Sequence, residues 1–254
     1  MEGLVDEGFA KKVLKAAESK PRIVVAFDPA INPYSKPRGE RSGERAKTVD
    51  WINKVLRELE GTVVGVKIGV PAIFALGLDA VEDMIKSFRK SYFFICDSKM
   101  ADIGHVNRLV AEQIFCAGFD ALIIHAVVGK KDGMDQVVDL AKNMGRGVLG
   151  LCAMSHPGAS EHLNKHFDGL LATAESSGVD GFVLPATFPD LIRKARSRYR
   201  SKLIFSPGVG TQGAPFGSAI SAGADFEIIG RSITHDASPA RKAMEIAEAM
   251  RGDR

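Results

Sequence analysis

The sequence predicts a single-domain (β/α)8 barrel, a TIM barrel, and three features of the 254-residue chain support this prediction. Short runs of β-branched and aromatic residues alternate with helical patterns, and the alternation repeats along the whole chain. The strand-like runs are almost continuously apolar, as expected for strands that helices bury on both faces. Eight such units fit in about 250 residues, the usual size of this barrel. An open, doubly wound sheet is the alternative architecture.

The predicted strands are short and rich in Val, Ile, Leu, Phe and Ala. No linker or shift in composition indicates a second domain, so the domain is expected to span residues 1–254. In chain order the predicted strands are 22–28, 62–68, 92–97, 120–125, 147–153, 181–184, 203–206 and 226–229.

A helical pattern follows each predicted strand. In the third of these, 105–117, Val106, Val110, Ile114 and Ala117 share one apolar face. An amphipathic N-terminal helix at about 6–19 precedes the first strand. The predicted helices after the strands are 44–59, 72–90, 105–117, 132–143, 161–176, 189–198, 216–222 and 239–251.

Composition excludes several classes of protein. With 45% apolar and 26% charged residues, the chain is typical of a soluble globular protein. The net charge of +3 is too small to favour a nucleic-acid partner. Cys96, Cys116 and Cys152 lie far apart without a C-x-x-C motif, which indicates reduced thiols and a cytoplasmic protein. The charged N-terminal helix is unlike a signal peptide, and no apolar run approaches the roughly 18 residues of a membrane span.

The charged segment 97–103 (DSKMADI) follows a predicted buried strand. Residues two apart in a strand share a face, so Asp97 and Lys99 should point the same way, with Asp102 just beyond. Lys67, on the preceding strand, completes a set of two positive and two negative charges. Alternating signs can keep all four ionised, orient a substrate and supply a proton to a developing carbanion. A purely structural ion network is the alternative.

The carboxyl ends of the other predicted strands are polar too, and in a barrel the chemistry collects at these ends. After the seventh and eighth strands, glycines allow backbone N–H groups to approach an anion, and Arg231 offers a fork that matches phosphate oxygens. These two loops therefore predict a phosphate site, although the glycines could serve only tight turns. The polar segments at strand ends are Asp28, His125, 155–159 (SHPGA), 206–213 (SPGVGTQG) and 230–232 (GRS).

Four other residues that could draw attention have simpler interpretations. His125 and His156 are expected to satisfy loop hydrogen bonds rather than to bind a metal or act as acids and bases. Trp51 and Met154 are interpreted as packing residues. Asp28, by contrast, ends the first strand and is expected to contact a ligand hydroxyl.

Six segments, one near each of six strand ends, together resemble the orotidine 5′-phosphate decarboxylase family, particularly its compact microbial and archaeal-type members. The resemblance implies a (β/α)8 barrel that forms a homodimer and converts orotidine 5′-monophosphate to UMP and CO2 without metal or cofactor. The segments are 26–28 (AFD), 66–69 (VKIG), 97–103 (DSKMADI), 154–159 (MSHPGA), 206–213 (SPGVGTQG) and 230–233 (GRSI).

The resemblance also implies roles for individual residues. Asp28 and Lys67 contact the ribose hydroxyls, Asp97 lies near the leaving carboxylate, and Lys99 protonates C6. Asp102 comes from the partner subunit. The catalytic set is thus Lys67, Asp97, Lys99 and Asp102. The resemblance further implies that Ile103 lies beside Asp102, that Ser155 contacts the pyrimidine edge, and that Pro207 and Val209 border the base. It also implies that Gln212, Gly230 and Arg231 contact the phosphate, and that Ile123 and Leu151 form a dry pocket beside the base.

The chain departs from the family pattern at Val106, where members often have a threonine that contacts a ribose hydroxyl across the dimer. A valine cannot make that hydrogen bond.

Three other functions are open on the sequence. Related metal-dependent enzymes, such as 3-keto-gulonate-6-phosphate decarboxylase and hexulose-phosphate synthase, share a similar charged motif. They place a magnesium-binding Glu where this chain has Lys67, and a cation there opposes a divalent metal. A barrel that binds a nucleotide and regulates without turnover is a second alternative. A Schiff-base aldolase using Lys67 or Lys99 is a third, although acidic neighbours favour the protonated lysine.

Overall fold

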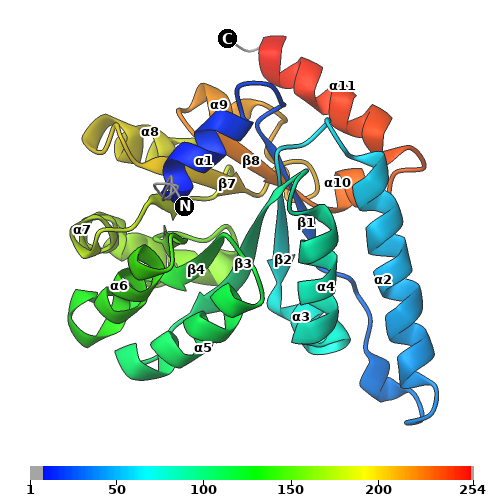
Figure 1. The fold of residues 1–254 in the computed structure, drawn as a ribbon. Helices are drawn as coiled ribbons and strands as arrows, with labels where there is room; N and C mark the ends of the chain where they lie inside the picture. The colour runs from blue at the N-terminus through cyan, green and yellow to red at the C-terminus, as the bar shows by residue number, and fades with distance from the viewer. Residues whose placement is uncertain (1–7, 253–254) are drawn as a thin grey trace, which may run out of the picture.

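The computed structural model describes residues 8–252 and confirms the predicted (β/α)8 barrel (Figure 1). All eight strands are parallel and follow one another in sequence order, and β8 pairs with β1 to close the barrel. The strands are β1 (Ile23–Phe27), β2 (Gly65–Gly69), β3 (Phe93–Met100), β4 (Ala121–His125), β5 (Gly147–Leu151), β6 (Gly181–Val183), β7 (Leu203–Pro207) and β8 (Phe226–Ile229).

The helices that follow the strands surround the barrel on its outer side, as Figure 1 shows. Short helical turns precede several of them, among them η1 (Pro33–Ser35), η2 (Ala126–Val128), η3 (Lys130–Met134), η4 (Pro157–Ser160) and η5 (Leu163–His166). The α-helices are α1 (Phe9–Ala16), α2 (Arg41–Glu58), α3 (Val70–Leu76), α4 (Leu78–Phe88), α5 (Gly104–Cys116), α6 (Asp135–Asn143), α7 (Phe167–Ser177), α8 (Pro189–Arg198), α9 (Ser218–Ser221), α10 (Arg231–Thr234) and α11 (Pro239–Gly252).

Several predicted helix boundaries were wrong for local reasons. The predicted helix 72–90 is two helices, α3 and α4, because Gly77 between them has a φ of 90°. The predicted helix 161–176 begins only at Phe167, after the turns η4 and η5. The predicted helix 132–143 begins as α6 at Asp135, because the preceding turn η3 has non-helical backbone angles at Lys131 and Asp132.

The predicted N-terminal helix, at about 6–19, is shorter than expected. It is observed as α1 between Phe9 and Ala16, and its first two predicted positions, 6 and 7, lie outside the described residues. Pro21 follows closely, and a proline disfavours helical conformation in the residue before it.

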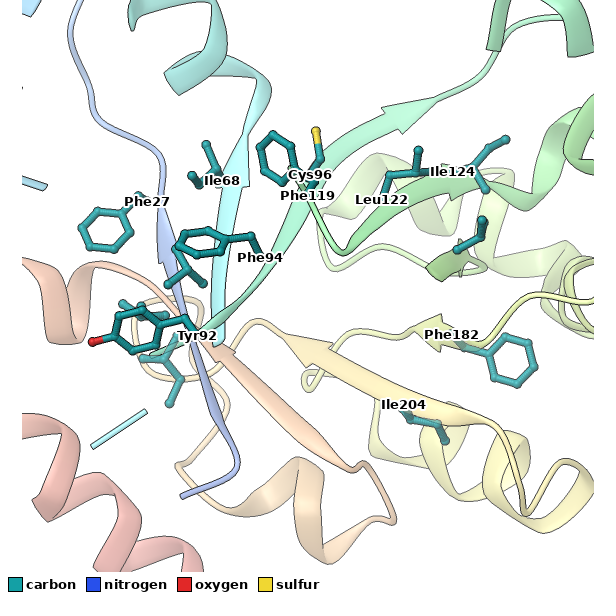
Figure 2. Close-up of a cluster of buried hydrophobic side chains, with 14 of the residues drawn as sticks. Phe27, Ile68, Tyr92, Phe94, Cys96, Phe119, Leu122, Ile124, Phe182 and Ile204 are labelled. Atoms are coloured by element: carbon teal, nitrogen blue, oxygen red, sulfur yellow. The ribbon is translucent and has the colours of Figure 1, made fainter. Parts of the chain in front are cut away.

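Alternation along the strands divides the core into two layers. The inner layer fills the barrel: Phe205 and Phe226 stack with ring centroids 4.8 Å apart, and Phe9 and Val13 of α1 join this cluster. The outer layer lies between strands and helices and includes Phe27, Phe94, Phe119 and Phe182 (Figure 2).

Strand β3 shows how this alternation positions the charged motif. Phe93 and Ile95 belong to the inner cluster, whereas Phe94 and Cys96 belong to the outer one. Continuing the alternation places Asp97, at the carboxyl end of β3, on the inner face. The fold therefore directs this carboxylate into the mouth of the barrel.

The three cysteines are free thiols; Cys96 and Cys152 are buried and Cys116 is exposed. Between residues 8 and 252, every helix is too short or too polar to cross a bilayer.

Candidate active site

A cavity of about 500 Å³ opens at the carboxyl ends of the strands and brings together most of the predicted site residues. Of the described residues predicted for the site, only Asp102 and Ile103 lie outside this cavity. The predicted residues that line it are Asp28, Lys67, Asp97, Lys99, Ser155, Pro207, Val209, Gln212, Gly230 and Arg231.

Four charged side chains form a row of alternating sign along one wall. The Lys67 Nζ atom lies 3.1 Å from Asp28 Oδ2 and 2.7 Å from Asp97 Oδ2. The Lys99 Nζ atom lies 2.6 Å from the other oxygen of Asp97, Oδ1. The order Asp28–Lys67–Asp97–Lys99 thus makes Asp97 the bridge between two ammonium groups. Within one chain, the fourth charged residue of this set is Asp28, whereas the sequence predicted Asp102.

Asp97 and Lys67, the central pair of the row, each keep the other ionised. Burial alone would raise the pKa of Asp97, but the ammonium groups of Lys67 and Lys99 outweigh it and hold that pKa below its usual value. Burial likewise opposes the charge of Lys67, yet Asp97 and Asp28 raise its pKa above the usual value. Lys67 is therefore a fixed cation. Lys99, with 39% of its side chain exposed, is the ammonium group that is more open to the cavity.

Gly69, at the end of β2, makes room for Asp28. A Cβ atom at this position would lie 1.8 Å from Asp28 Oδ1, far inside van der Waals contact. Gly69 follows Lys67 by two residues on the same strand and faces the same side. A side chain there would push Asp28 away from Lys67.

Another part of the cavity wall is apolar. Ile123 on β4, Leu151 on β5 and Val183 on β6 are all buried and line it. Trp51 and Met154 also line the cavity, in addition to packing against the core as predicted. A ligand held here would contact both charged side chains and a dry, apolar surface.

The loop after β7 lines the cavity and contacts the loop after β5. The Ser155 hydroxyl, after β5, donates to Gln212 Oε1 at 2.7 Å, so the two loops are linked. Gly208 and Gly210 have φ values of 103° and 71°, which side-chain-bearing residues rarely adopt. Arg231 begins α10 and lines the same cavity as Gln212. The two loops predicted to bind phosphate therefore converge.

Sequence reasoning missed Glu227, which anchors the far end of that loop. Its carboxylate, on β8, is fully buried and accepts hydrogen bonds from the Gly217 and Ala219 N–H groups, both at 3.0 Å. The only sequence signal is an acidic residue inside the apolar run 226–229. The loop 208–217 thus returns to the barrel at a fixed point.

Asp102 and Ile103 occupy the turn between β3 and α5. The Asp102 carboxylate accepts a hydrogen bond from the Ile103 N–H at 2.7 Å, and Asn107 bonds both backbone groups of Asp102. Ile103 is 54% exposed. Three more apolar side chains are exposed: Leu109 and Val110 on α5, and Val127 on η2, after β4.

His125 and His156 differ from expectation in the hydrogen bonds of their side chains. Nδ1 of His125 is buried and has no hydrogen-bond partner among residues 8–252, so the predicted loop hydrogen bond is not made by this atom. Burial and the nearby Lys99 ammonium lower the pKa of His125, which favours the neutral ring. His156 is exposed, and the Ala159 N–H donates at 3.0 Å to its backbone carbonyl rather than to its ring, so the predicted loop hydrogen bond of this side chain is not observed among residues 8–252 either.

Within the described part of the chain, no group of three His, Cys, Asp or Glu side chains has the spacing of a metal site.

Comparison with known proteins gives one family. A family model described as the orotidine 5′-phosphate decarboxylase / HUMPS family matches residues 21–246. An orotidine 5′-phosphate decarboxylase from Methanosarcina mazei is 38% identical over 201 residues, which is 79% of this chain and 89% of the relative. One from Aeropyrum pernix is 34% identical over 232 residues, covering 91% of this chain and 89% of the relative.

A solved structure agrees with these relatives. The crystal structure of orotidine 5′-monophosphate decarboxylase from Methanocaldococcus jannaschii, complexed with the inhibitor BMP, matches with a TM-score of 0.77 at 26% identity. The match covers 91% of this chain and 98% of that one.

Proposed function

The chain belongs to the orotidine 5′-phosphate decarboxylase / HUMPS family, and on this basis we propose that it is the enzyme that converts orotidine 5′-monophosphate to UMP and CO2 in pyrimidine biosynthesis. The observation that carries the proposal is the row Asp28–Lys67–Asp97–Lys99 in one cavity with Arg231. The row provides a proton donor beside a carboxylate. Arg231 provides a counterion for the phosphate of the substrate.

The shape of the cavity supports a particular orientation of the substrate. The phosphate binds between Arg231, Gln212 and the backbone at Gly230, and the ribose hydroxyls contact Asp28 and Lys67. This places C6 of the pyrimidine towards Asp97 and Lys99. The base lies against Ile123, Leu151, Pro207 and Val209, with Ser155 at its polar edge.

The proposed chemistry uses Lys99 as the acid. Cleavage of the C6–carboxylate bond leaves its electron pair on C6, where resonance gives little help, so electrostatic stabilisation must lower the barrier. The Lys99 ammonium stabilises that pair and then transfers a proton to C6, which forms UMP and leaves a neutral amine that regains its proton from water. Asp97 holds Lys99 in place at 2.6 Å.

We propose that no metal takes part, because a cation already occupies the relevant position. Lys67 Nζ lies between the Asp28 and Asp97 carboxylates, the two groups that would otherwise ligate a divalent ion. The metal-dependent sugar-phosphate enzymes that share a similar motif are the competing assignment.

The test is incubation of the purified protein with orotidine 5′-monophosphate, following the loss of its ultraviolet absorbance with and without a chelator. We expect the same turnover rate with and without the chelator. Turnover of 3-keto-gulonate 6-phosphate that needs magnesium, without turnover of the nucleotide, would contradict it. Nucleotide binding without CO2 release would instead indicate a regulatory barrel.

We also propose that the enzyme is a two-fold homodimer in which Asp102 completes the partner's site. Asp102 is exposed, lies outside its own cavity and is held by Asn107. The exposed apolar side chains Ile103, Leu109, Val110 and Val127 supply a surface that a second copy could cover. In a two-fold dimer each chain gives and receives the same contact.

Mixed dimers test this arrangement. Lys99→Ala and Asp102→Ala chains, each inactive alone, are unfolded together and refolded at equal ratio. Random pairing makes about half the dimers mixed, and each of these holds one intact site, so about a quarter of wild-type activity should return. If Asp102 served its own chain, every site would carry one defect. Background activity, with mixed dimers confirmed by mass, would therefore refute the shared site.

Two further expectations depend on this function. Val106 on α5 lacks the hydroxyl with which family members contact the ribose, so ribose binding across the dimer is expected to be weaker or rearranged there. The free thiols of the three cysteines support a cytoplasmic location.

A further inference from the structure

The pairing between β3 and β4 is irregular at the charged motif. Cys96 lies opposite Leu122 and Met100 opposite Ile124, so three residues of β3 face the single residue Ile123. The excess of two residues forms a bulge that contains both Asp97 and Lys99. Bulges redirect side chains and interrupt the ladder of backbone hydrogen bonds.

The backbone of the bulge is in an unusual conformation. Lys99 has a φ of 45°, in the left-handed region that side-chain-bearing residues avoid. Such conformations persist only where neighbouring contacts hold them. Lys99 also has to keep its ammonium 2.6 Å from Asp97 although 39% of its side chain is exposed. Some contact must fix the bulge.

Ser98, between the two charged residues, makes a hydrogen bond across the bulge. Its hydroxyl donates to the carbonyl of Ile123 at 2.9 Å, across the point where the register is interrupted. The Ile123 side chain lines the cavity on the apolar wall. One hydrogen bond therefore joins the backbone of the charged wall to the backbone of the apolar wall.

We infer that Ser98 is a positioning residue, whose hydrogen bond to Ile123 holds the β3 bulge in the shape that aims Lys99 at the reacting carbon. The inference rests on the proposed function, since it is the role of Lys99 as acid that makes its position matter. Ser98 acts through the backbone, so its loss should affect the chemical step and leave the phosphate and ribose contacts in place.

The first test compares Ser98→Ala with a control outside the cavity, Ser177→Ala. Ser177 is a buried serine on α7, and its hydroxyl donates to the backbone carbonyl of Thr173 at 2.8 Å. Ser98→Ala should lower kcat by roughly 10- to 100-fold, since an ångström of misplacement can cost that much, with KM for orotidine 5′-monophosphate unchanged within about twofold. Ser177→Ala should keep kcat within about twofold, and Ser98→Thr, which retains the hydroxyl, should recover most of the loss.

Several results would overturn the inference. These are a Ser98→Ala enzyme with wild-type kcat, an equal loss of kcat in Ser177→Ala, or a Ser98→Thr enzyme as impaired as Ser98→Ala. If Ser98→Ala does not fold, Ser98→Cys replaces it, because a thiol has similar volume and is a weaker donor. A wild-type kcat in Ser98→Cys would then count against the role.

A second readout does not depend on turnover. The rate at which an amine reagent labels Lys99, measured by peptide mass mapping, reports how firmly its ammonium is held at Asp97. Labelling should be several-fold faster in Ser98→Ala than in wild type and unchanged in Ser177→Ala. Equal labelling rates in wild type and Ser98→Ala would refute the positioning role. An inactive wild-type protein would refute the proposed function while this measurement still tested Ser98.

Discussion

Replacing Asp97 with asparagine should destabilise the protein far more than an ordinary surface substitution. Asp97 is 8% exposed and is the carboxylate that joins two ammonium groups, at 2.7 Å from Lys67 and 2.6 Å from Lys99. Asparagine has nearly the same shape but no charge. The buried Lys67 ammonium would then keep only Asp28, a half-exposed carboxylate 3.1 Å away.

The size of the effect follows from what remains after the substitution. Removing one member of a buried ion pair typically costs 3–5 kcal/mol, because the other charge stays buried without compensation. Here Asp28 still compensates Lys67 in part, and Lys99 can turn towards water. We therefore expect the lower end of the range, about 3 kcal/mol of unfolding free energy at pH 7.

Urea denaturation at pH 7 measures this loss without the ionic screening of guanidinium. Asp168→Asn is a matched control: Asp168 also bridges two cations, Lys194 at 2.7 Å and Arg198 at 3.0 Å, but on the surface with 54% of its side chain exposed. Solvent screens such pairs, so this control should change the midpoint little. An Asp97→Asn protein that loses no more stability than Asp168→Asn would refute the reasoning.

Three other predictions follow from the same geometry. Arg231→Ala should cost about 2–4 kcal/mol with the phosphorylated substrate and almost nothing with orotidine, and equal losses with both would show that Arg231 does not bind the phosphate. Gly69→Ala should displace Asp28, whose Oδ1 lies 1.8 Å from the added Cβ position, and raise KM; an unchanged KM would remove Asp28 from the binding site. The pKa of Asp97 is lower in the folded protein than in the unfolded chain, so its stabilising contribution is complete above about pH 4 and declines as the pH falls below that value. Urea titrations between pH 3 and 5 should show wild type losing more stability than Asp97→Asn, and parallel losses would contradict this.

The sequence predicted the parts of the site that depend on periodicity. Asp97 continues the inner-face positions Phe93 and Ile95 of one strand, so the direction of its side chain followed from alternation. The glycine-rich loop after β7 and Arg231 after β8 could be placed together once the strands were counted, because a barrel gathers the carboxyl ends of its strands.

Contacts that depend on exact register or on the path of a loop were not predictable. The ion pair between Lys67 and Asp28 needs the β1–β2 register, in which Ala26 lies opposite Lys67, and the missing side chain of Gly69. Glu227 stood out in an apolar strand, but its partners Gly217 and Ala219 depend on the route of the β7–α9 loop. The bulge in β3 likewise comes from the register with β4 and leaves no periodic signal in the sequence.

The central claim, that Lys99 supplies the proton for decarboxylation, is tested most directly by CO2 release from orotidine 5′-monophosphate in Lys99→Ala, with UMP affinity measured on the same preparation. The account predicts that CO2 release falls by roughly 10²–10⁴-fold or more, the range for loss of a general acid, while the Kd for UMP changes little. Near-normal CO2 release by this variant would contradict the account.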